Sequence, residues 1–449
     1  MSKIKDVLKN VDQTKALIIE RGAMEQVADL FKDQFPGARA VIVADHNMYE
    51  MVGKEIARQF DEGQVTMEPP YIFNDGDPSA TYVNVELLAG ALRKHDAIPV
   101  AVGSGIINDL TKLASHQSCR RYMCVVTAGS VDGYTAFGSS VTLNGSKQTF
   151  SCPAPQACLA DVDIISSAPL TMSAAGYADV MAKVTAGADW ILADAMGEEP
   201  LNNIAWDIVQ GGLHEALSHP EGIVERNKDT FALLTERLML CGLAMQHAKS
   251  TRPASGAEHH FSHLWDMEHH THHGRQVAHG FQVAIGTLAL TALYEQLLQT
   301  PMEELDVDHC CEQWPELDDF ISRAVGKFNG TDFLQIGVYE MIAKYISREK
   351  LREQLTQLKL NWPAIKERVS AQIIPFAEVK RCLRVVGAPT EPEEIGITRA
   401  YLRETFYRAF YIRRRYTILD LAIRTDMMER WLDALFGAGG IWPVDELHY

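Results

Sequence analysis

The hydrophobic and polar positions in the first third of the chain follow two alternating patterns. Amphipathic stretches with helical periodicity occupy Met24–Phe35 and Ile106–Ser115. Around them lie continuous apolar runs that are as long as buried strands, at Ala38–Asp45, Pro99–Val102, Tyr122–Ala128 and Ala157–Ile165. Strands that alternate with helices predict an α/β domain built on a parallel sheet.

The pattern changes near Ala168-Pro169. Almost everything from Thr171 onward has helical periodicity, most clearly at Ala174–Ala195, Thr230–Lys249, Gln282–Leu298, Leu351–Leu360 and Thr398–Ala422. A chain of 449 residues also exceeds the size at which a single core keeps growing. We therefore predict two domains, an α/β nucleotide-binding domain over 1–169 and an all-helical domain over 170–449.

Composition narrows the classes of partner and compartment. No apolar run approaches the roughly 20 residues of a membrane span, and no signal peptide is expected from the first 20 residues. The eight cysteines include no CxxC pair, which favours a reducing cytoplasm. A formal charge of −17 disfavours nucleic acid and anionic membrane as partners. It leaves a small anionic substrate possible, because such a ligand responds to local charge.

Half of the sixteen histidines lie between Ser255 and Gly280. They are His259, His260, His263, His269, His270, His272, His273 and His279. Neutral imidazole is a common ligand of divalent metals, so this segment is a candidate metal site. We interpret His269 to His273 as a solvated loop. His259 and His263 differ from these, because a spacing of four places them on one face of a helix.

Two positions in the first domain are candidates for nucleotide binding. Gly103-Ser104-Gly105 follows a predicted strand and opens a predicted helix, where the backbone can approach a pyrophosphate. Asn108 replaces the usual third glycine, so this motif alone is a weak indication. Asp45 ends an earlier predicted strand. It either holds a ribose hydroxyl and repels a 2′-phosphate, or it only caps the following helix.

Two further segments carry polar groups of interest. The turn TAGSVDGY at residues 127–134 is either plain turn chemistry or a wall for nicotinamide and substrate beside the glycine loop. Asp179 lies in an otherwise apolar helix, where a buried carboxylate is costly unless it is paired or bound to a metal. A salt bridge to Lys183, four residues later, is the alternative.

Taken together and in this order, these segments resemble the sn-glycerol-1-phosphate dehydrogenases. This group is a branch of the iron-containing alcohol dehydrogenase, glycerol dehydrogenase and dehydroquinate synthase superfamily. The resemblance covers nearly the whole chain, through GSGIINDLTK, TAGSVDGY, LADVDIISSAP, GYADVMAKVTAGADW, SGAEHHFSH and HGFQVAIGTL. The segment GAPTEPEEIGITRAYLRETFYRAFYIRRRYTILDL is similar to the bacterial form. The resemblance implies a dehydroquinate synthase-like fold with metal and substrate held by the helical domain.

The resemblance also implies a role for each matched residue. The metal ligands correspond to Asp179, His259 and His279. His263 and Asp132 correspond to catalytic groups that contact the substrate, and Asp179 also belongs to the substrate site.

The cofactor residues follow from the same match. Asp45 corresponds to the acidic position that favours NAD over NADP. Ala136 departs from the family, which usually has a serine there, and we expect weaker cofactor binding without loss of activity. The remaining cofactor-binding residues are Gly103, Ser104, Gly105, Ile106, Ile107, Asn108, Asp109, Thr127 and Ser130.

The activity that the resemblance implies is the interconversion of dihydroxyacetone phosphate and sn-glycerol 1-phosphate, a step of phospholipid metabolism. It uses NAD, or NADP, and one divalent metal, in a homodimer. Three protein ligands leave an open position, and two nitrogens with one carboxylate suit zinc, while nickel and iron also fit. Three alternatives remain. They are a glycerol or polyol dehydrogenase, a metal- and NAD-dependent carbocyclic synthase of the dehydroquinate synthase type, and a non-catalytic metal-binding protein.

Arg413, Arg414 and Arg415 are candidates for binding a substrate phosphate, because guanidinium groups match phosphate geometry. Consecutive residues of a helix cannot all face one pocket, however. On the predicted helix Thr398–Ala422 the three arginines are better explained as a solvated or salt-bridged face than as a substrate contact. We therefore leave them out of the predicted site.

Overall fold

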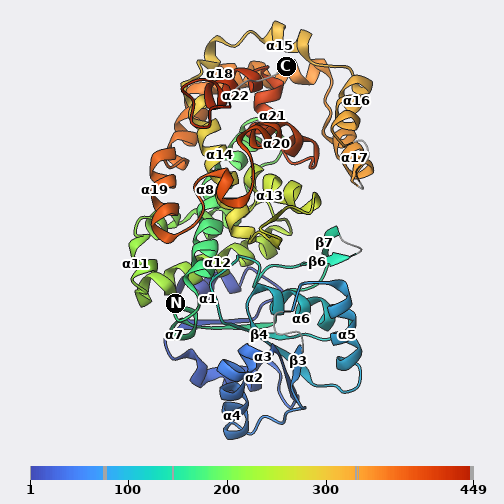
Figure 1. The fold of residues 1–449 in the computed structure, drawn as a ribbon, viewed down its shortest axis with the longest axis vertical. Helices are drawn as coiled ribbons and strands as arrows, with labels where there is room; N and C mark the ends of the chain where they lie inside the picture. The colour runs from blue at the N-terminus through green and yellow to red at the C-terminus, as the bar shows by residue number, and fades with distance from the viewer. Residues whose placement is uncertain (1, 74–77, 144–145, 329–330, 332, 445–449) are drawn as a thin grey trace. The chain divides into compact units, whose positions relative to one another are not determined.

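The computed structural model describes residues 2–73, 78–143, 146–328, 331 and 333–444 (Figure 1). The chain forms two compact units. Unit 1 comprises residues 1–180, 204–253 and 385–387, and unit 2 comprises residues 181–203, 254–384 and 388–449. The division at residue 169 that the sequence suggests stays a prediction, and each unit is described by itself below.

Unit 1 contains a parallel six-stranded sheet with the order β1-β8-β5-β4-β2-β3. Its strands are β1 (Ala16–Glu20), β2 (Ala40–Asp45), β3 (Tyr71–Phe73), β4 (Ile98–Gly103), β5 (Met123–Val126) and β8 (Ala157–Asp161). The central strands are buried on both faces, which explains why they are continuous apolar runs in the sequence. A separate antiparallel hairpin pairs β6 (Ser139–Leu143) with β7 (Ser146–Phe150).

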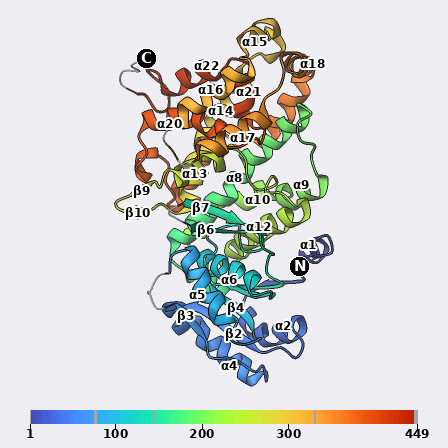
Figure 2. The same cartoon turned by 90° about the vertical axis from the view of Figure 1, so that its right-hand side faces the viewer.

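Helices cover both faces of this sheet. Figures 1 and 2 show α5 (Tyr82–Leu92) and α6 (Gly105–Gln117) on one face, and α2 (Val27–Gln34) and α4 (Lys54–Glu62) on the other. Phe31 of α2 and Phe60 of α4 pack together against the strands in the core of the unit. The other helical segments of unit 1 are α1 (Ser2–Leu8), η1 (Ala23–Gln26), α3 (His46–Met48), η2 (Tyr49–Gly53), α7 (Val162–Ile165), α9 (Asn203–Gln210), α10 (Leu213–Leu217), α11 (Glu221–Val224) and α12 (Lys228–Ala248). Helix α8 (Leu170–Ala195) begins in unit 1, and its residues from 181 onward belong to unit 2.

The strand order reverses at β2, because β3 lies on one side of β2 and β4 on the other. In open α/β sheets, ligands bind at the carboxyl ends of the strands beside such a reversal. Val43 pairs with Ala101, and the same register carried two residues further sets Asp45 opposite Gly103. The two nucleotide-binding candidates from the sequence therefore end neighbouring strands at the reversal.

In unit 2 the described residues form helices and a short hairpin of β9 (Thr271–His272) and β10 (Arg275–Gln276). Its helix α14 (His279–Gln299) is long and apolar enough to cross a membrane, but 78% of its apolar stretch is buried, as in the central helix of a folded core. It packs on α13 (Ala257–Met267), which in turn packs on α20 (Arg399–Tyr411). The remaining segments are η3 (Met302–Glu304), α15 (Val307–Gln313), α16 (Leu317–Phe328), α17 (Leu334–Lys344), α18 (Arg348–Gln372), α19 (Phe376–Val386), η4 (Pro392–Ile395), α21 (Ile418–Arg424) and α22 (Met428–Phe436).

Two predicted elements end earlier than their apolar patterns suggest. The run Ala157–Ile165 is a strand only as far as Asp161, whose carboxylate accepts a hydrogen bond from the backbone N of Asp163 and starts α7. The predicted helix Thr398–Ala422 is wrong as a single element, because residues 412–417 form a loop between α20 and α21. Thr417 and Asp420 form a capping box that begins a new helix there.

Candidate functional site

Asp179, His259 and His279 lie together. Each offers one ligand atom, and the three atoms lie within 4.8 Å of one another. Asp179 is in the middle of α8, His259 is in the first turn of α13, and His279 is the first residue of α14. The imidazole centroids of His259 and His279 are 5.3 Å apart. The side chain of Asp179 is fully buried. Two imidazoles and one carboxylate at this spacing form a donor set that suits a divalent metal.

Glycines allow the backbones that carry these ligands to approach closely. A Cβ atom on Gly176, three residues before Asp179, would lie 2.0 Å from the carbonyl oxygen of Gly129. A Cβ atom on Gly286 of α14 would lie 2.7 Å from the carbonyl oxygen of Glu258. Only a residue without a side chain fits at either position, so α8 packs directly on the turn at residue 129, and α14 packs directly on α13.

Glu258 orients the first histidine. Nδ1 of His259 lies 2.8 Å from Oε1 of Glu258, a buried carboxylate that also accepts hydrogen bonds from Gly256 N at 2.6 Å and Thr185 Oγ1 at 2.9 Å. A carboxylate can only accept, so Nδ1 of His259 carries the proton and Nε2 presents its lone pair. Burial pushes the pKa of Glu258 upward, but the contact with His259 and the Gly256 N–H outweigh it and hold the pKa below its usual value.

A chain of hydrogen bonds orients the second histidine in the same sense. Ser262 Oγ donates to Gln282 Oε1 at 2.6 Å, and Gln282 Nε2 donates to Asp266 Oδ1 at 3.1 Å. The serine has only one proton, so its oxygen accepts from Nδ1 of His279, 3.0 Å away. In both histidines Nδ1 is therefore hydrogen-bonded to a second residue, and the lone pair of Nε2 is the one available to a metal. This arrangement is usual for metal-ligating histidines.

Glu258→Gln is expected to weaken Zn²⁺ binding by about 10- to 100-fold, because the substitution removes the charge that supports the His259 ring. Calorimetric titration of the chelated protein with Zn²⁺ measures this. Glu268, just after the C-terminal end of the same helix, pairs with Arg408 and offers a matched control. Glu268→Gln should leave the zinc affinity unchanged. An unchanged affinity in Glu258→Gln would show that the carboxylate does not support the ligand.

The predicted cofactor loop lies where β4 passes into α6. Ser104, Gly105 and Ile106 are accessible at the start of the helix, with Ser104 as its N-cap. Ile107 and Asn108 are buried, and the amide of Asn108 accepts from Tyr122 Oη at 2.9 Å and donates to the Tyr134 carbonyl. Within residues 103–109, residues 104–106 are therefore the most accessible to a ligand, whereas the side chains of Ile107 and Asn108 are buried beneath the loop.

Asp109 is half-buried, and its carboxylate lies 3.6 Å from Lys112 Nζ. Burial raises the pKa of this carboxyl.

Lys112 fixes the turn that carries Asp132. Its buried ammonium donates to the carbonyls of Gly133, Ala136 and Gly138 at 3.0, 2.9 and 3.0 Å. The backbone N of Asp132 donates to Oδ2 of Asp179 at 2.9 Å. The turn is therefore hydrogen-bonded both to α6, through Lys112, and to Asp179, a predicted metal ligand. Sequence reasoning missed Lys112, although it follows the GSG motif on the buried face of an amphipathic helix.

The other residues matched to this turn are buried below its surface. Thr127 and Ser130 are almost fully buried, and Ser130 Oγ lies 3.3 Å from Tyr134 Oη, which donates to the Ala128 carbonyl. Ala136 is buried as well, and its carbonyl accepts from Lys112.

Asp45 makes the capping contact that the sequence allows. Its Oδ1 accepts a hydrogen bond from Met48 N at 2.8 Å at the start of α3. Among the residues that the structure describes, its other oxygen has no hydrogen bond. The carboxylate can therefore cap the helix and still accept a hydrogen bond from a ligand beside Gly103.

The histidine-rich segment separates into two parts. His263 lies one turn after His259 on α13, with ring centroids 6.3 Å apart, so it is close to the predicted ligands. His269 to His273 follow the end of α13 and lead into the β9–β10 hairpin. His269 and His273 have positive φ angles of 55° and 50°. His269 and His273 are exposed, whereas His270 and His272 are half-buried and His270 Nε2 lies 2.6 Å from the carbonyl oxygen of Ile395. The solvated-loop interpretation of this stretch stays a prediction.

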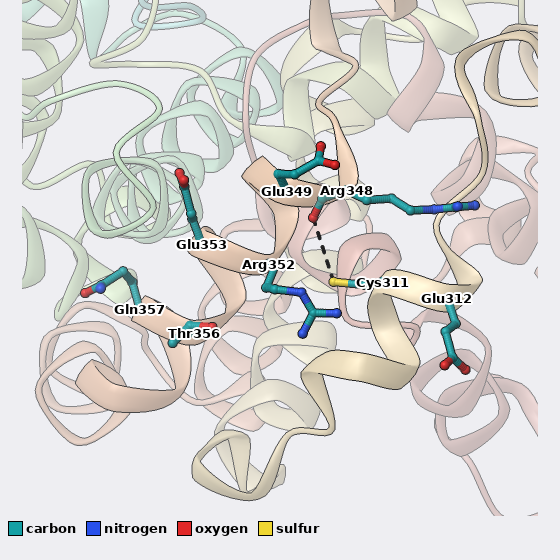
Figure 3. A pocket seen from close by; sticks show the side chains of 8 residues that line it. All are labelled: Cys311, Glu312, Arg348, Glu349, Arg352, Glu353, Thr356 and Gln357. Atoms are coloured by element: carbon teal, nitrogen blue, oxygen red, sulfur yellow. Dashed lines mark hydrogen bonds between the residues drawn. The ribbon is translucent and has the colours of Figure 1, made fainter.

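A separate hollow of about 680 Å³ lies between α15 and α18 in unit 2. Arg348 pairs with Glu316 at 2.9 Å and Arg352 pairs with Asp308, so acids already neutralise its two cations. Figure 3 shows that the lining side chains point in different directions rather than toward a common point. No residue that the sequence assigns to the site lines this hollow, and we assign no ligand to it.

Comparison with known proteins supports the same class of protein as the geometry of the site, a metal-dependent dehydrogenase. The iron-containing alcohol dehydrogenase family matches residues 18–169. A relative from Halalkalibacterium halodurans is 35% identical over 267 residues, which cover 58% of this chain and 66% of the relative. A relative from Bacillus licheniformis is 33% identical over 355 residues, which cover 77% and 88%. Both are named glycerol-1-phosphate dehydrogenase, with NAD(P)+ in the name.

A solved structure extends the likeness to the whole fold. Glycerol dehydrogenase from Schizosaccharomyces pombe is 16% identical, with a TM-score of 0.59, and the alignment covers 94% of this chain and 92% of that one. At this identity the likeness concerns the fold alone. It confirms the predicted fold class, a parallel α/β region followed by a helical one.

Proposed function

The chain belongs to the glycerol-1-phosphate dehydrogenase family, which makes it an NAD(P)-dependent oxidoreductase, and we propose that it interconverts dihydroxyacetone phosphate and sn-glycerol 1-phosphate. The observation that carries this proposal is the cluster of Asp179, His259 and His279, whose donor atoms lie within 4.8 Å. Asp179 of this cluster accepts a hydrogen bond from the turn at residues 127–134, which follows β5 beside the predicted nucleotide site. A non-catalytic metal-binding protein would not need this connection.

The residues present fit a divalent metal. Both histidines have Nδ1 engaged by a second residue and Nε2 available, and three protein ligands leave an open position for substrate or water. The donor set suits zinc first and does not exclude nickel or iron. A bound ion would act as a Lewis acid on the substrate oxygen, which is worth several kcal/mol of transition-state stabilisation.

The chain's own residues provide position and proton transfer. Asp132 is held against Asp179 by its backbone N–H, and in this proposal its carboxylate contacts the substrate hydroxyl groups. His263, one turn from His259, orients the substrate or moves the proton of the reacting oxygen. A bound nicotinamide cofactor would supply or accept the hydride. In this proposal residues 103–109 would hold the cofactor through the accessible positions 104–106, and the buried Thr127 and Ser130 would support the turn beside it.

The proposal also covers the cellular compartment, the cytoplasm, and the assembly, a homodimer. All eight cysteines are free, and seven of them are buried, which supports a reducing cytoplasm. The homodimer rests on the family resemblance.

Net NADH consumption tests this function. Protein with bound Zn²⁺ should oxidise NADH in the presence of dihydroxyacetone phosphate, in one-to-one ratio with product. The product should resist oxidation by an sn-glycerol-3-phosphate-specific dehydrogenase. A carbocyclic synthase would show no net NADH consumption, and a plain glycerol dehydrogenase would prefer dihydroxyacetone. Either result would overturn the proposed substrate.

Asp45→Ala is expected to raise the use of NADPH relative to NADH by about tenfold, because removing the carboxylate removes its repulsion of the 2′-phosphate. The ratio of kcat/KM for the two cofactors measures this. Asn is a matched replacement that keeps a capping oxygen for α3, so Asp45→Asn separates the loss of charge from the loss of the cap. An unchanged ratio in both variants would remove Asp45 from the cofactor site.

A further inference from the structure

Lys112 is a charged residue in the interior of unit 1. Its side chain is 1% exposed and lies on α6, about two turns after the predicted cofactor loop begins that helix. A buried lysine is rare unless its ammonium is paired or hydrogen-bonded. The carboxylate of Asp109 lies 3.6 Å away, but the closest partners of the ammonium are backbone carbonyls. Its role therefore concerns the segment that carries those carbonyls.

The three carbonyls that accept from Lys112 belong to one short segment, residues 133–138. Nζ donates to the carbonyl of Gly133 at 3.0 Å, that of Ala136 at 2.9 Å and that of Gly138 at 3.0 Å. An ammonium group has three protons and no lone pair, so each proton has an acceptor here. Hydrogen bonds from a charged donor are stronger than those between neutral groups. One side chain therefore holds the whole segment against α6.

Helix α12 also contacts this segment. Thr135 Oγ1 donates to the carbonyl of Met239 at 2.7 Å, and Gln246 Nε2 donates to the carbonyl of Thr135 at 2.5 Å. A Cβ atom on Gly242 would lie 2.2 Å from Thr135 Oγ1, so the helix and the segment are in direct contact. The contacts from α12 fix the middle of the segment, whereas those from Lys112 include both of its ends.

The start of the segment meets a predicted metal ligand. Asp132 precedes Gly133 in the chain, and its backbone N donates to Oδ2 of Asp179 at 2.9 Å. A hydrogen bond from outside the ligand set orients the ligand that accepts it. A displacement of Gly133 also displaces the N–H of Asp132, because the two residues are consecutive. The bond from Lys112 to Gly133 therefore bears on the orientation of Asp179.

We propose that Lys112 is a positioning residue of the metal and substrate site, and that its ammonium sets the place of Asp132 through the carbonyls of residues 133–138. The inference rests on the proposed function, in which Asp179 binds the metal and Asp132 contacts the substrate. The accessible residues 104–106 lie at the start of α6, about two turns before Lys112. Loss of the ammonium should therefore affect metal and substrate binding while leaving cofactor binding intact.

Lys112→Met removes the charge and keeps most of the side-chain volume. Calorimetric titration of the chelated variant with Zn²⁺ should show about tenfold weaker binding, the lower end of the effect of losing a contact that orients a metal ligand. KM for dihydroxyacetone phosphate should rise by about 10- to 100-fold, as expected when a hydrogen bond to a charged group is lost. The Kd of NADH should change less than about twofold, since the start of α6 is distant from the substitution.

Arg237→Met is the matched control. Arg237 is a buried cation on α12 that donates to the carbonyl of Gly211 at 2.6 Å, outside the segment 133–138. Its replacement should lower the Tm and leave the Zn²⁺ affinity, the KM and the NADH affinity unchanged. A lower Tm without weaker Zn²⁺ binding in Lys112→Met would show a merely structural role. Equal losses of Zn²⁺ and NADH affinity would place the effect on the cofactor loop, and either result would overturn the proposal.

Lys112→Ala tests the charge itself and replaces Lys112→Met if that variant does not fold. The shortened side chain leaves room for propylammonium, which carries the atoms that the variant lacks. Propylammonium should restore the Zn²⁺ affinity, whereas propan-1-ol, of similar size and without charge, should not. Restoration by both compounds or by neither would contradict the role of the ammonium. If the wild-type protein does not reduce dihydroxyacetone phosphate, the proposed function fails, and the Zn²⁺ and NADH affinities still decide the role of Lys112.

Discussion

His259→Ala is expected to lower the rate of NADH oxidation with dihydroxyacetone phosphate by about a thousandfold or more. The substitution removes one of the three proposed metal ligands, and the Lewis acid that they would hold is worth several kcal/mol, at 1.36 kcal/mol per tenfold in rate. It also leaves Glu258 buried without its hydrogen-bond donor from the ring, which lies 2.8 Å away in the native protein. Zinc should therefore no longer raise the Tm of the variant, which steady-state kinetics and thermal melts check together.

The control for this variant is another histidine of the same segment. His273 lies in the exposed β9–β10 hairpin, outside the ligand cluster. His273→Ala should retain full activity and the full effect of zinc on Tm. Activity of His259→Ala within tenfold of the wild-type value, at equal metal content, would contradict the assignment of His259 as a ligand.

Asp189→Ala is expected to destabilise unit 2 by about 3 kcal/mol or more, because it leaves buried donors without an acceptor. Asp189 is fully buried on α8. It accepts hydrogen bonds from Ala257 N at 2.7 Å, Tyr294 Oη at 2.6 Å and Ile418 N at 2.8 Å. One carboxylate thus joins α14 to the first residues of α13 and α21. Calorimetry should show a Tm lower by roughly 6–12 °C.

Asp194 provides the matched control on the same helix. Its carboxylate pairs with Arg368 at 3.0 Å at the surface, where an ion pair contributes at most about 1 kcal/mol. Asp194→Ala should therefore shift the Tm by only a few degrees. Comparable shifts in the two variants would show that the buried network adds nothing beyond a surface pair.

The fold class was predictable because its strands are buried on both faces. Runs such as Ala38–Asp45 are then continuously apolar, and β2 and β4 occur close to the expected bounds. The β6–β7 hairpin and the short edge strand β3 gave no such run and were missed. The break at residues 412–417 had a signal in Thr417 and Asp420, a capping-box pair inside an apparently continuous helical pattern.

The candidate site was predictable in its residue types and not in its supporting contacts. Asp179 is conspicuous as a carboxylate in an apolar helix, and His259 as part of a histidine cluster. His279 came only from the family resemblance. Glu258 and Ser262 support the two histidines through contacts between helices, and no local pattern reveals which ring nitrogen such a contact engages. Lys112 was missed because a helical lysine is usually exposed, whereas here it is buried under three carbonyls.

The most direct test of the central claim is the restoration of turnover by metal. Protein stripped by a chelator should bind NADH and fail to oxidise it with dihydroxyacetone phosphate. One equivalent of Zn²⁺ or Ni²⁺ per chain should then restore the rate. Full activity in the stripped protein, or no activity with any divalent metal despite intact NADH binding, would contradict a metal-dependent dehydrogenase acting on this substrate.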